Sequence, residues 1–469
     1  MNRRARPFWI AEALSGETEL AARPLSAAIR ADLAIVGGGY TGFWTAIRAK
    51  QQQPDLDVVI IDADIVGGGA SGRNGGCVLS WSTKLPTLVR LYGETEAARL
   101  VRASEQAILD IDAFVRLHRI DCDWRLDGTL YTATSQAQVG ASDGVMRALE
   151  ERGLSQWTRL ATDEVRRRAG SRAHLEGWYS PVAASVQPGK LVRGLRRVAR
   201  DLGVRLYEGT PLSRLTGGQR VQLETPRGRI TADRAVIAVN AWMGTLFPSF
   251  RRSIAIVSSD MVITEPNPTA LTRSGLDRGI SVLDSRTFVH YYRSTSDGRL
   301  MLGKGGNTFA FGGRMLDVFD QPSPYAESLQ KALRSFVPEF SHTPIAASWN
   351  GPSDRSVTGL PFFGSLPGHS NVWYGFGYSG NGVGPTRMGG EILSSLALGL
   401  DNDWTRSPLT AGPLGRFPPE PIRYVGSMIV RNAIRRQERA EDESRAVRPW
   451  DRRLASLAAS AGKADKTSA

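Results

Sequence analysis

A run of glycines near the N-terminus, placed between an apolar segment and a helix-like segment, constrains the fold most strongly. The apolar residues 34–36 lead into Gly37, Gly39 and Gly42, which match the pattern G-x-G-x-x-G. In this pattern the first glycine makes a tight turn after a strand, the second leaves room for a pyrophosphate, and the third lets the next helix pack closely. We expect that helix over residues 40–50, so that the amides around Tyr40 and Thr41 point at the phosphates. The segment therefore predicts the first β-α unit of a dinucleotide-binding fold.

A second apolar segment, residues 58–61, ends on Asp62. An acid about twenty residues after the glycines can accept hydrogen bonds from both hydroxyls of an adenosine ribose, whereas it would repel a 2′-phosphate. Glycine-rich turns also occur in proteins that bind no ligand. Here strand, glycines, helix, strand and acid come in the required order, which favours a dinucleotide such as FAD or NAD and does not separate the two.

A second loop of small residues, 67–76, follows shortly after the acid. Glycine costs backbone entropy on folding and buries no side chain, so such a loop does not suit a packed core. It suits a segment laid against a flat ring system, with amides and hydroxyls directed at ring and phosphate atoms. The candidate cofactor contacts in this loop are Ala70, Ser71, Arg73, Asn74, Gly75 and Gly76.

With the motif G-A-S-G-R-N-G-G at residues 69–76, the sequence resembles the D-amino-acid oxidase, glycine oxidase and sarcosine oxidase-like flavoproteins, and most of all the branch with gamma-glutamylputrescine oxidase-type enzymes. The resemblance runs over about residues 8–399. It implies FAD contacts for Ser71, Arg73 and Asn74. A surface salt bridge is the weaker alternative for Arg73.

The same resemblance implies cofactor contacts from three later segments. Backbone groups at Leu212 would read the adenine, and Asn240 would lie at a strand end beneath the cofactor. A glycine-rich turn before a helix at residues 385–398 would face the N1/C2 carbonyl edge of the flavin, where a positive helix end favours negative charge. Its candidate residues are Gly380, Asn381, Gly382 and Val383.

The chain length of 469 residues exceeds that of a single-core domain. We expect an α/β (α+β overall) protein with a Rossmann-like FAD-binding domain assembled from separated segments and a substrate domain with an antiparallel sheet. The predicted boundaries are an N-terminal docking segment (1–30), the FAD-binding domain (31–86, 180–250 and 345–400), the substrate domain (87–179 and 251–344), and a basic helical extension (401–469) whose end, from residue 456, is disordered.

Within the substrate domain, residues 88–120 show helical spacing and predict two helices over the substrate region. Polar helices are expected near residues 145–152 and 164–169, and an amphipathic helix after residue 188. The alternating segments between residues 254 and 302 predict antiparallel strands. This alternation places His290 and Tyr292 on one face, and Tyr291 and Arg293 on the other.

Composition excludes several classes of protein. Two cysteines, Cys77 and Cys122, cannot form a disulfide framework, which suits a reducing cytoplasm. Five scattered histidines show no paired ligand spacing, so we expect no metal. The net charge of +13 lacks a nucleic-acid motif and favours a solvated basic surface. No apolar run approaches the ~20 residues of a membrane span, and the basic start at residues 1–7 has no apolar segment behind it, which argues against a secretory signal.

The catalytic candidates rest on the resemblance. In family members that act on free amino acids, an arginine before the G-L-P turn (residues 359–361) binds the substrate carboxylate, and Ser353 stands at that place here. This departure favours an amine or a substituted amine, although Arg355 or Arg293 could bind a distal acid. Related oxidases place a lysine over the flavin, and Lys304 is the candidate; a solvated loop lysine is an equal alternative. Covalent attachment is not expected, because Cys77 stands at the wrong place and is better explained as a small buried thiol.

The sequence thus predicts FAD-dependent, non-covalent oxidation of an amine to an imine that hydrolyses to a carbonyl. The expected partners are a small-molecule amine and O2 or another electron acceptor, with no nucleic acid and no membrane span. Two alternatives stay open: an NAD(P)H-dependent flavin hydroxylase, for which we find no nicotinamide-reading signature, and a flavoprotein whose FAD is structural.

Overall fold

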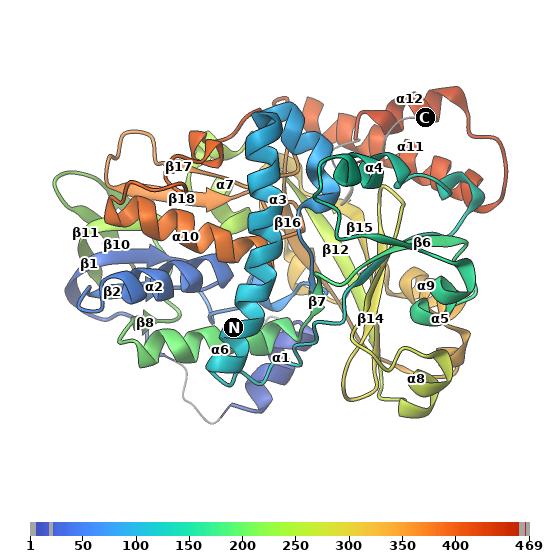
Figure 1. The fold of residues 1–469 in the computed structure, drawn as a ribbon. Coiled ribbons are helices and arrows are strands. Elements are labelled where there is room, and N and C mark those ends of the chain that lie inside the picture. Colours follow the sequence, from blue (N-terminus) through green and yellow to red (C-terminus); the bar gives the residue numbers. More distant parts are fainter. Residues whose placement is uncertain (1–5, 18–21, 459–464, 466–469) are drawn as a thin grey trace.

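A computed structural model describes residues 6–17, 22–458 and 465 of the chain. Two large sheets stand side by side, with the long helix of residues 85–117 at their junction (Figure 1). The first sheet carries the glycine motifs, and the second carries the alternating segments of the middle of the chain. Both were expected, and together they confirm the mixed α/β architecture.

The first sheet has a mostly parallel path in the order β17-β18-β11-β1-β2-β8. Strands β18, β11, β1, β2 and β8 pair in parallel, and β17 runs antiparallel at the edge. Two short strands, β9 and β10, extend from β11. The strands are β1 (Ala28–Val36), β2 (Val58–Ile61), β8 (Arg205–Tyr207), β9 (Arg214–Thr216), β10 (Val221–Glu224), β11 (Arg229–Ile237), β17 (Phe362–Ser365) and β18 (Val372–Phe376).

Three helices cover one face of this sheet: α2 (Tyr40–Gln52), α6 (Pro188–Asp201) and α10 (Pro385–Leu398) (Figure 1). All three begin where the sequence predicted them. Gly390 of α10 lies so close to α2 that a β-carbon there would be 2.4 Å from the β-carbon of Trp44. Helices from residues 40 and 385 thus pack directly together, which brings two distant glycine turns to one edge of the sheet.

The second sheet has the order β16-β12-β15-β14-β13-β4-β6-β5. The predicted antiparallel pairing of its central strands is confirmed, but β13 and β4 pair in parallel. Its strands are β4 (Thr129–Ala133), β5 (Thr158–Leu160), β6 (Glu176–Ser180), β12 (Ile254–Thr264), β13 (Ser281–Asp284), β14 (His290–Ser294), β15 (Leu300–Phe309) and β16 (Ile345–Ser356).

One boundary of the expected cofactor domain differs from the structure. We placed residues 345–400 in that domain, but β16 pairs along its whole length with β12 and is the edge strand of the second sheet. The cofactor sheet resumes only at β17. The physical reason is that β16 has twelve residues and can pair with β12 while its last residues still reach the cofactor sheet, where Arg355 bridges to Tyr378.

The long helix α3 (Leu85–Leu117) is two helices, as expected, because Gly93 interrupts it with φ 78°. Its position differs from the prediction, since it packs against α10 and α4 at the junction of the two sheets. The polar helices α4 (Asp143–Glu151) and α5 (Thr162–Ala169) are confirmed. A two-stranded ladder, β3 (Cys77–Val78) with β7 (Ala184–Ser185), follows the second glycine loop.

The N-terminal segment is a docked helix, α1 (Phe8–Ser15), as predicted. Trp9 is fully buried, and its ring meets that of Trp349 in β16 edge-on at 5.7 Å. The remaining helices are α7 (Met243–Leu246), α8 (Pro268–Ser274), α9 (Ala326–Phe336), α11 (Ile422–Asp442) and α12 (Pro449–Ser456). Helix α11 contains the predicted helical stretch of the extension.

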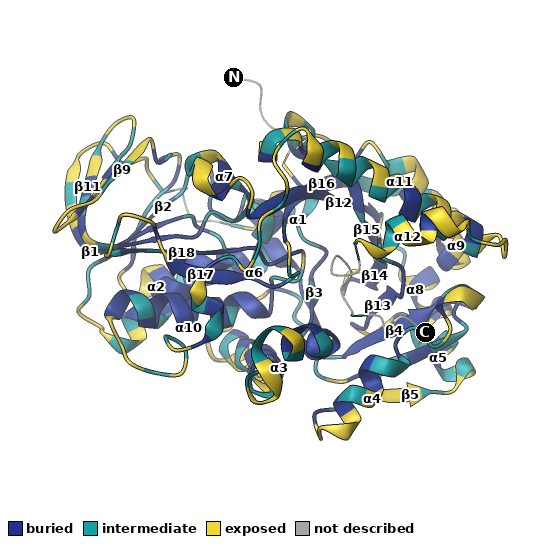
Figure 2. Cartoon of the chain, turned by 90° about the horizontal axis from the view of Figure 1, so that it is seen from above, coloured by how far each residue is buried: buried dark blue, intermediate teal, exposed yellow. Residues whose placement is uncertain are grey.

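Burial follows this layering: the central strands of both sheets are mostly buried, while the outlying strands β5 and β9, helices α11 and α12 and the tip of α4 have exposed residues (Figure 2). We expected disorder from residue 456 onward. Ser456 is the last residue of α12, and Asp465 accepts a hydrogen bond from the Thr87 amide, so these residues differ from the expectation. Residues 459–464 and 466–469 lie outside the described residues. Among the residues that the structure describes, no helix is long and apolar enough to cross a membrane.

Candidate cofactor and active site

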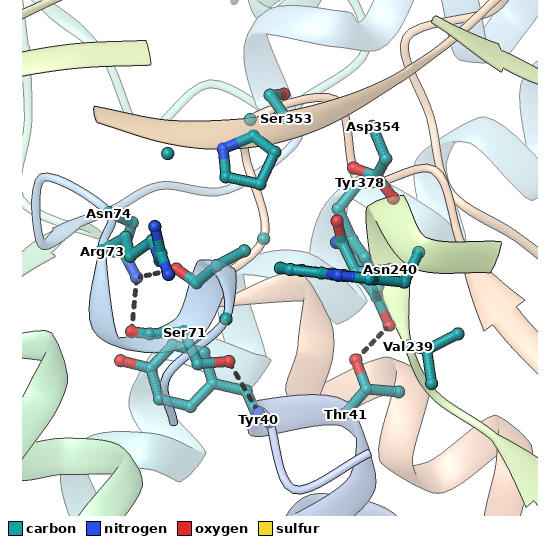
Figure 3. Close-up of a pocket in the computed structure, with 18 of the residues that line it drawn as sticks. Tyr40, Thr41, Ser71, Arg73, Asn74, Val239, Asn240, Ser353, Asp354 and Tyr378 are labelled. Atoms are coloured by element: carbon teal, nitrogen blue, oxygen red, sulfur yellow. Dashed lines mark hydrogen bonds between the residues drawn. The ribbon is translucent and has the colours of Figure 1, made fainter. Parts of the chain in front are cut away.

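A single long cavity runs from the carboxyl edge of the cofactor sheet to the second sheet (Figure 3). Its walls come from all the glycine turns that the sequence singled out. The predicted cofactor residues that line it are Gly37, Gly39, Tyr40, Thr41, Asp62, Ala70, Ser71, Arg73, Asn74, Gly75, Leu212, Asn240, Gly380, Gly382 and Val383. Segments more than 300 residues apart in sequence therefore form one site.

The first glycine turn is held to both of its neighbours by hydrogen bonds. The amide of Gly38 donates to Asp62 Oδ2 at 2.8 Å, and the amide of Tyr40 donates to Ser71 Oγ at 2.9 Å. Gly42 does not line the cavity: a β-carbon there would lie 2.0 Å from the carbonyl oxygen of Gly37. Its role is the close packing of α2 that the motif predicts, and it has no direct contact with a ligand.

Asp62 marks one end of the cavity. Burial raises the pKa of its carboxyl group to about 6, against the lowering effect of the Asp64 and Gly38 amides. An acid at this depth is stabilised by donors to its oxygens, and ribose hydroxyls are such donors. Leu212 lines the same end. This arrangement suits an adenosine.

The second glycine loop is braced mainly by its own side chains. Asn74 Nδ2 donates to the Ser71 carbonyl at 2.9 Å, and Asn74 Oδ1 accepts from the Gly76 amide at 2.8 Å. Gly76 itself does not line the cavity, because its backbone packs against Val186 and Arg293. The Asn74 side chain thus fixes the shape of the loop. The loop therefore presents mainly backbone atoms to a ligand.

The Arg73 guanidinium has partners within the protein, and the FAD contact that the resemblance implied stays a prediction. The Arg73 side chain borders the cavity, but the guanidinium donates to the carbonyls of Gly68 and Phe319 and pairs with Asp320 at 2.7 Å. The side chain is 9% exposed, so this is a buried ion pair and not the surface salt bridge that we weighed. It ties the loop to residues 317–320, beside the second sheet. Sequence spacing carries no sign of this partner, since the two residues are 247 positions apart.

The third glycine turn is held by Asp354 of β16. Its carboxylate accepts hydrogen bonds from the amide of Gly377, and burial raises its pKa to about 6. Tyr378 from the same turn hydrogen-bonds through its hydroxyl to Thr41 Oγ1 at 3.1 Å, which joins this turn to α2 (Figure 3). Asn381 points elsewhere, with Nδ2 donating to the Ser80 carbonyl at 3.2 Å. Sequence analysis missed Asp354 and Tyr378; the only available signal was their position next to the glycine-rich segment.

The far end of the cavity lies against the second sheet. Tyr291 and Ser259 face it and share a hydrogen bond of 2.8 Å between their hydroxyls, and Met261 lies beside them. Tyr291 and Arg293 therefore point to the cavity side of the sheet, and His290 and Tyr292 point to the other. Cys77 also lines the cavity and is half-buried, which corrects our expectation of a buried thiol.

Two side chains of β16 enter this end. Ser353 Oγ is buried and, among the described residues, has no hydrogen-bond partner. The Arg355 guanidinium lies between two glycines, within 3.5 Å of a β-carbon built on Gly305 and 3.3 Å of one built on Gly380. Its depth in the protein lowers the pKa of Arg355, although the side chain borders the cavity. A hydroxyl and a cation thus face the same space.

Lys304 does not belong to this site. We expected a lysine at a strand end, but Lys304 lies in the middle of β15, and its ammonium donates to the Phe288 carbonyl at 3.0 Å and pairs with Glu438 at 3.3 Å. It points to the face of the sheet that carries His290, away from the cavity. The candidate was chosen by resemblance to oxidases with a lysine over the flavin, and that resemblance does not fix on which face of the strand the side chain lies. The neighbouring Gly303 and Gly306 are accommodated within the strand by packing against Tyr291 and Phe288.

These features fit a dinucleotide with a ring system at the sheet junction. A ribose-binding acid, two helix N-termini and a loop of backbone amides succeed one another along the cavity, and an orphaned hydroxyl lies near its far end. The fold and the cavity define a two-sheet protein of the flavoprotein type, in which one cavity extends from a Rossmann-like sheet to a second sheet.

Comparison with known proteins supports an FAD-binding fold. The chain belongs to the family described as FAD dependent oxidoreductase, whose model matches residues 32–396. It is therefore an FAD-dependent oxidoreductase. The "Probable oxidoreductase OrdL" of Rhizobium meliloti is 31% identical over 80% of this chain and 84% of that protein. The "Gamma-glutamylputrescine oxidoreductase" of Escherichia coli is 28% identical over 80% of this chain and 85% of that protein.

Solved structures support the same fold. The glycine oxidase of Geobacillus kaustophilus superposes with a TM-score of 0.67 at 21% identity, over 81% of this chain and 98% of the other. The L-proline dehydrogenase of P.horikoshii has a TM-score of 0.66 at 15% identity, over 81% of this chain and 96% of the other.

Proposed function

We propose that this protein oxidises the C–N bond of a primary or secondary amine, or of an amino-acid derivative, to an imine that hydrolyses to a carbonyl. The observation that carries the proposal is the agreement between the cavity and the relatives. Relatives whose names state a substrate act on nitrogen compounds, gamma-glutamylputrescine and glycine. The electrons pass to O2 or to another acceptor, and the low cysteine content suits the cytoplasm as the compartment.

The bound FAD supplies the hydride acceptor for this reaction. The protein has to hold the substrate carbon beside the flavin, exclude water and stabilise charge. Met261 and Phe288 give the far end of the cavity an apolar wall. The hydroxyl pair of Tyr291 and Ser259 offers hydrogen bonds to an uncharged amine. Burial raises the pKa of Tyr291, so this hydroxyl stays protonated at neutral pH.

The residues at the far end support an amine in preference to a simple α-amino acid. Ser353 is neutral and stands where related amino-acid oxidases are expected to have their carboxylate-binding arginine. Arg355 lies two residues further along β16 and also borders the cavity. We propose Arg355 as the residue that binds an acidic group of the substrate some distance from the reacting nitrogen, as in an amine that carries a distal carboxylate.

The cofactor contacts proposed for the loaded protein fall into two groups. Backbone atoms of Gly37, Gly39 and the loop 67–76 would hold the pyrophosphate and the flavin, and Asp62 would hold the ribose. Gly42, Gly76 and Asn381 would shape these turns from behind. Of the two catalytic candidates from the sequence, we retain Arg355, and Lys304 is withdrawn.

The test is anaerobic mixing of the purified holoprotein with a panel of amines, read as loss of the flavin absorbance near 450 nm. The panel contains gamma-glutamylputrescine, putrescine, benzylamine, sarcosine and glycine. We expect bleaching without NAD(P)H, fastest with an amine that bears a distal carboxylate, and slower with glycine. Bleaching that requires NAD(P)H, or none with any amine, would refute the proposal. Peroxide release on readmission of air then separates O2 from other acceptors.

A further inference from the structure

The loop between β13 and β14, residues 285–289, forms part of the wall at the far end of the cavity. Thr287, Phe288 and Val289 line the cavity. The Phe288 ring packs on Gly306 of β15, which has φ +80° and where a β-carbon would lie 2.0 Å from the ring. The Phe288 ring therefore forms a fixed part of the cavity wall.

The opposite side of this loop is held by one residue of the C-terminal helix α11. Glu438 Oε1 accepts a hydrogen bond from the Phe288 amide at 3.1 Å, and Oε2 pairs with Lys304 at 3.3 Å. Lys304 in turn donates to the Phe288 carbonyl at 3.0 Å. Glu438 and Lys304 thus bind both polar backbone groups of Phe288, and the Glu438 side chain is 10% exposed.

A second contact fixes the start of the loop. The Arg286 guanidinium pairs with Asp442 of α11 and with Asp284 of β13, and donates to Thr134 Oγ1 at 2.8 Å. Asp284 also accepts from the amide of His290 at 2.9 Å. The loop is therefore anchored near both of its ends, and α11 contributes to the anchoring through Glu438 and Asp442, one helical turn apart.

Helix α11 also forms hydrogen bonds to strand β15. Arg431 donates to the Asn307 carbonyl and Arg435 donates to Asn307 Oδ1, both at 2.9 Å. Asn307 is one residue from Gly306, on which the Phe288 ring packs. Helix α11 thus holds both surfaces that position the ring, and Figures 1 and 2 show it lying alongside β15 and β12.

This helix lies outside the residues matched by the family model, which end at 396. We propose that the C-terminal extension determines substrate access in this protein, and that Glu438 is the positioning residue through which α11 holds Phe288 at the cavity wall. The consequence for turnover rests on the proposed amine oxidation, whereas the consequence for loop order does not.

The experiment compares holoprotein carrying Glu438→Ala with the wild type and with Glu443→Gln. Glu443 follows α11, is exposed and pairs only with Arg445 among the described residues, so this variant removes one negative charge without touching the loop. Two measurements need no substrate: hydrogen exchange at the Phe288 amide, and acrylamide quenching of the bound-flavin fluorescence. We expect about tenfold faster exchange in Glu438→Ala and a larger quenching constant, with both unchanged in Glu443→Gln.

The third measurement uses the panel amine that bleaches the flavin fastest. We expect KM to rise about tenfold in Glu438→Ala while kcat stays within about twofold, because Glu438 acts on the wall and not on the reacting atoms. If this variant does not fold, Glu438→Gln replaces it; it keeps an acceptor for Phe288 but loses the charge opposite Lys304, and partial effects in the same direction are expected.

The outcomes separate the two proposals. Unchanged exchange and quenching in folded Glu438→Ala, or equal changes in Glu443→Gln, would overturn the role of Glu438. Altered exchange and quenching support it even where no amine reacts, in which case the proposed function fails on its own.

Discussion

Around β1, the atoms that face the cavity come from turns whose form is dictated by neighbours in sequence: three glycines, an acid after a strand, and a helix N-terminus. Around β15, residues at the cavity wall are held by contacts between distant segments, such as Glu438 with the Phe288 amide and Arg286 with Asp442. The cofactor region is thus encoded by local backbone requirements, and the substrate region by long-range pairing. Mutations in the two regions should therefore act through different physical causes.

The largest loss of stability is expected where the tightly packed backbone of the cofactor region leaves no room for a side chain. Gly42→Ala places a methyl group 2.0 Å from the Gly37 carbonyl oxygen, and overpacking of this kind should lower the free energy of unfolding by about 3 kcal/mol. The purified variant should also lose its yellow colour. Thermal unfolding and the flavin absorbance measure both effects.

Gly426→Ala in α11 is the matched control. A β-carbon there meets nothing within 4 Å, so the better helix propensity of alanine should stabilise the protein by up to about 1 kcal/mol. A Gly42→Ala protein that keeps both its melting temperature and its FAD would show that local backbone packing does not govern this region.

The next effect tests long-range pairing. Arg73→Met removes the donor to two backbone carbonyls and the cation that pairs with Asp320, and should cost about 2–3 kcal/mol of unfolding free energy. Arg220→Met is the control, because Arg220 and Asp233 are 53% and 50% exposed and such a pair contributes about 0–1 kcal/mol. Denaturant titration of both variants gives the comparison; equal costs would contradict the buried role of Arg73.

The free energy of unfolding should depend on pH through His174, which packs against the second sheet. Burial lowers the pKa of His174 from 6.5 to about 4, while its ring hydrogen-bonds to Thr132 and Tyr292. Because the folded protein disfavours the proton, the stability from neutral His174 is complete above pH 6.5 and is lost as the pH falls toward 4. The loss between pH 7.5 and pH 5 should be about 2 kcal/mol.

The measurement compares the pH dependence of unfolding in the wild type and in His174→Gln, since other buried groups titrate in the same range. Asp62, for example, contributes with the opposite sign: its raised pKa stabilises the fold at low pH, and that contribution is lost as the pH rises through about 6. Parallel pH curves for wild type and His174→Gln would contradict the prediction.

The smallest effect concerns the orphaned hydroxyl. Ser353→Ala removes no hydrogen bond within the described protein, so stability should stay within about 0.5 kcal/mol. If the hydroxyl meets the substrate, KM for the best amine should rise by about fivefold, which corresponds to about 1 kcal/mol for one hydrogen bond. Ser281→Ala, at a buried hydroxyl of β13 that also lacks a partner and does not line the cavity, should leave KM unchanged.

The sequence predicted the elements of the cofactor region better than the strand pairing of the substrate region. The helix from Tyr40, the strand before Asp62 and the helix from residue 385 were predicted with close boundaries, because capping turns and periodicity are local signals. The place of β16 was wrong, since pairing between strands 90 residues apart depends on the whole sheet. The alternating pattern correctly placed Tyr291 and Tyr292 on opposite faces of the sheet, but it did not indicate which of the two faces the cavity.

Side-chain roles were harder to predict than positions. Fifteen predicted cofactor residues line the cavity, yet whether they bind FAD stays a prediction. Lys304 was misassigned because the resemblance did not fix the face of the strand on which it lies, and its partner Glu438 comes from an extension without a recognisable motif. Asp354 was overlooked because its function is to bind amides of a turn whose conformation the sequence alone does not give.

The order of strands in the cofactor sheet has a consequence for synthesis on the ribosome. Strand β1 emerges early, but β18 and α10, which complete the same sheet and abut α2, emerge more than 300 residues later. At about 5–20 residues per second, tens of seconds separate the two events. During that interval the nascent chain has an unfinished hydrophobic edge and no complete cofactor site. Ribosome-bound chains that stop before residue 372 should therefore need chaperones and take up no flavin, whatever the FAD concentration in the cell.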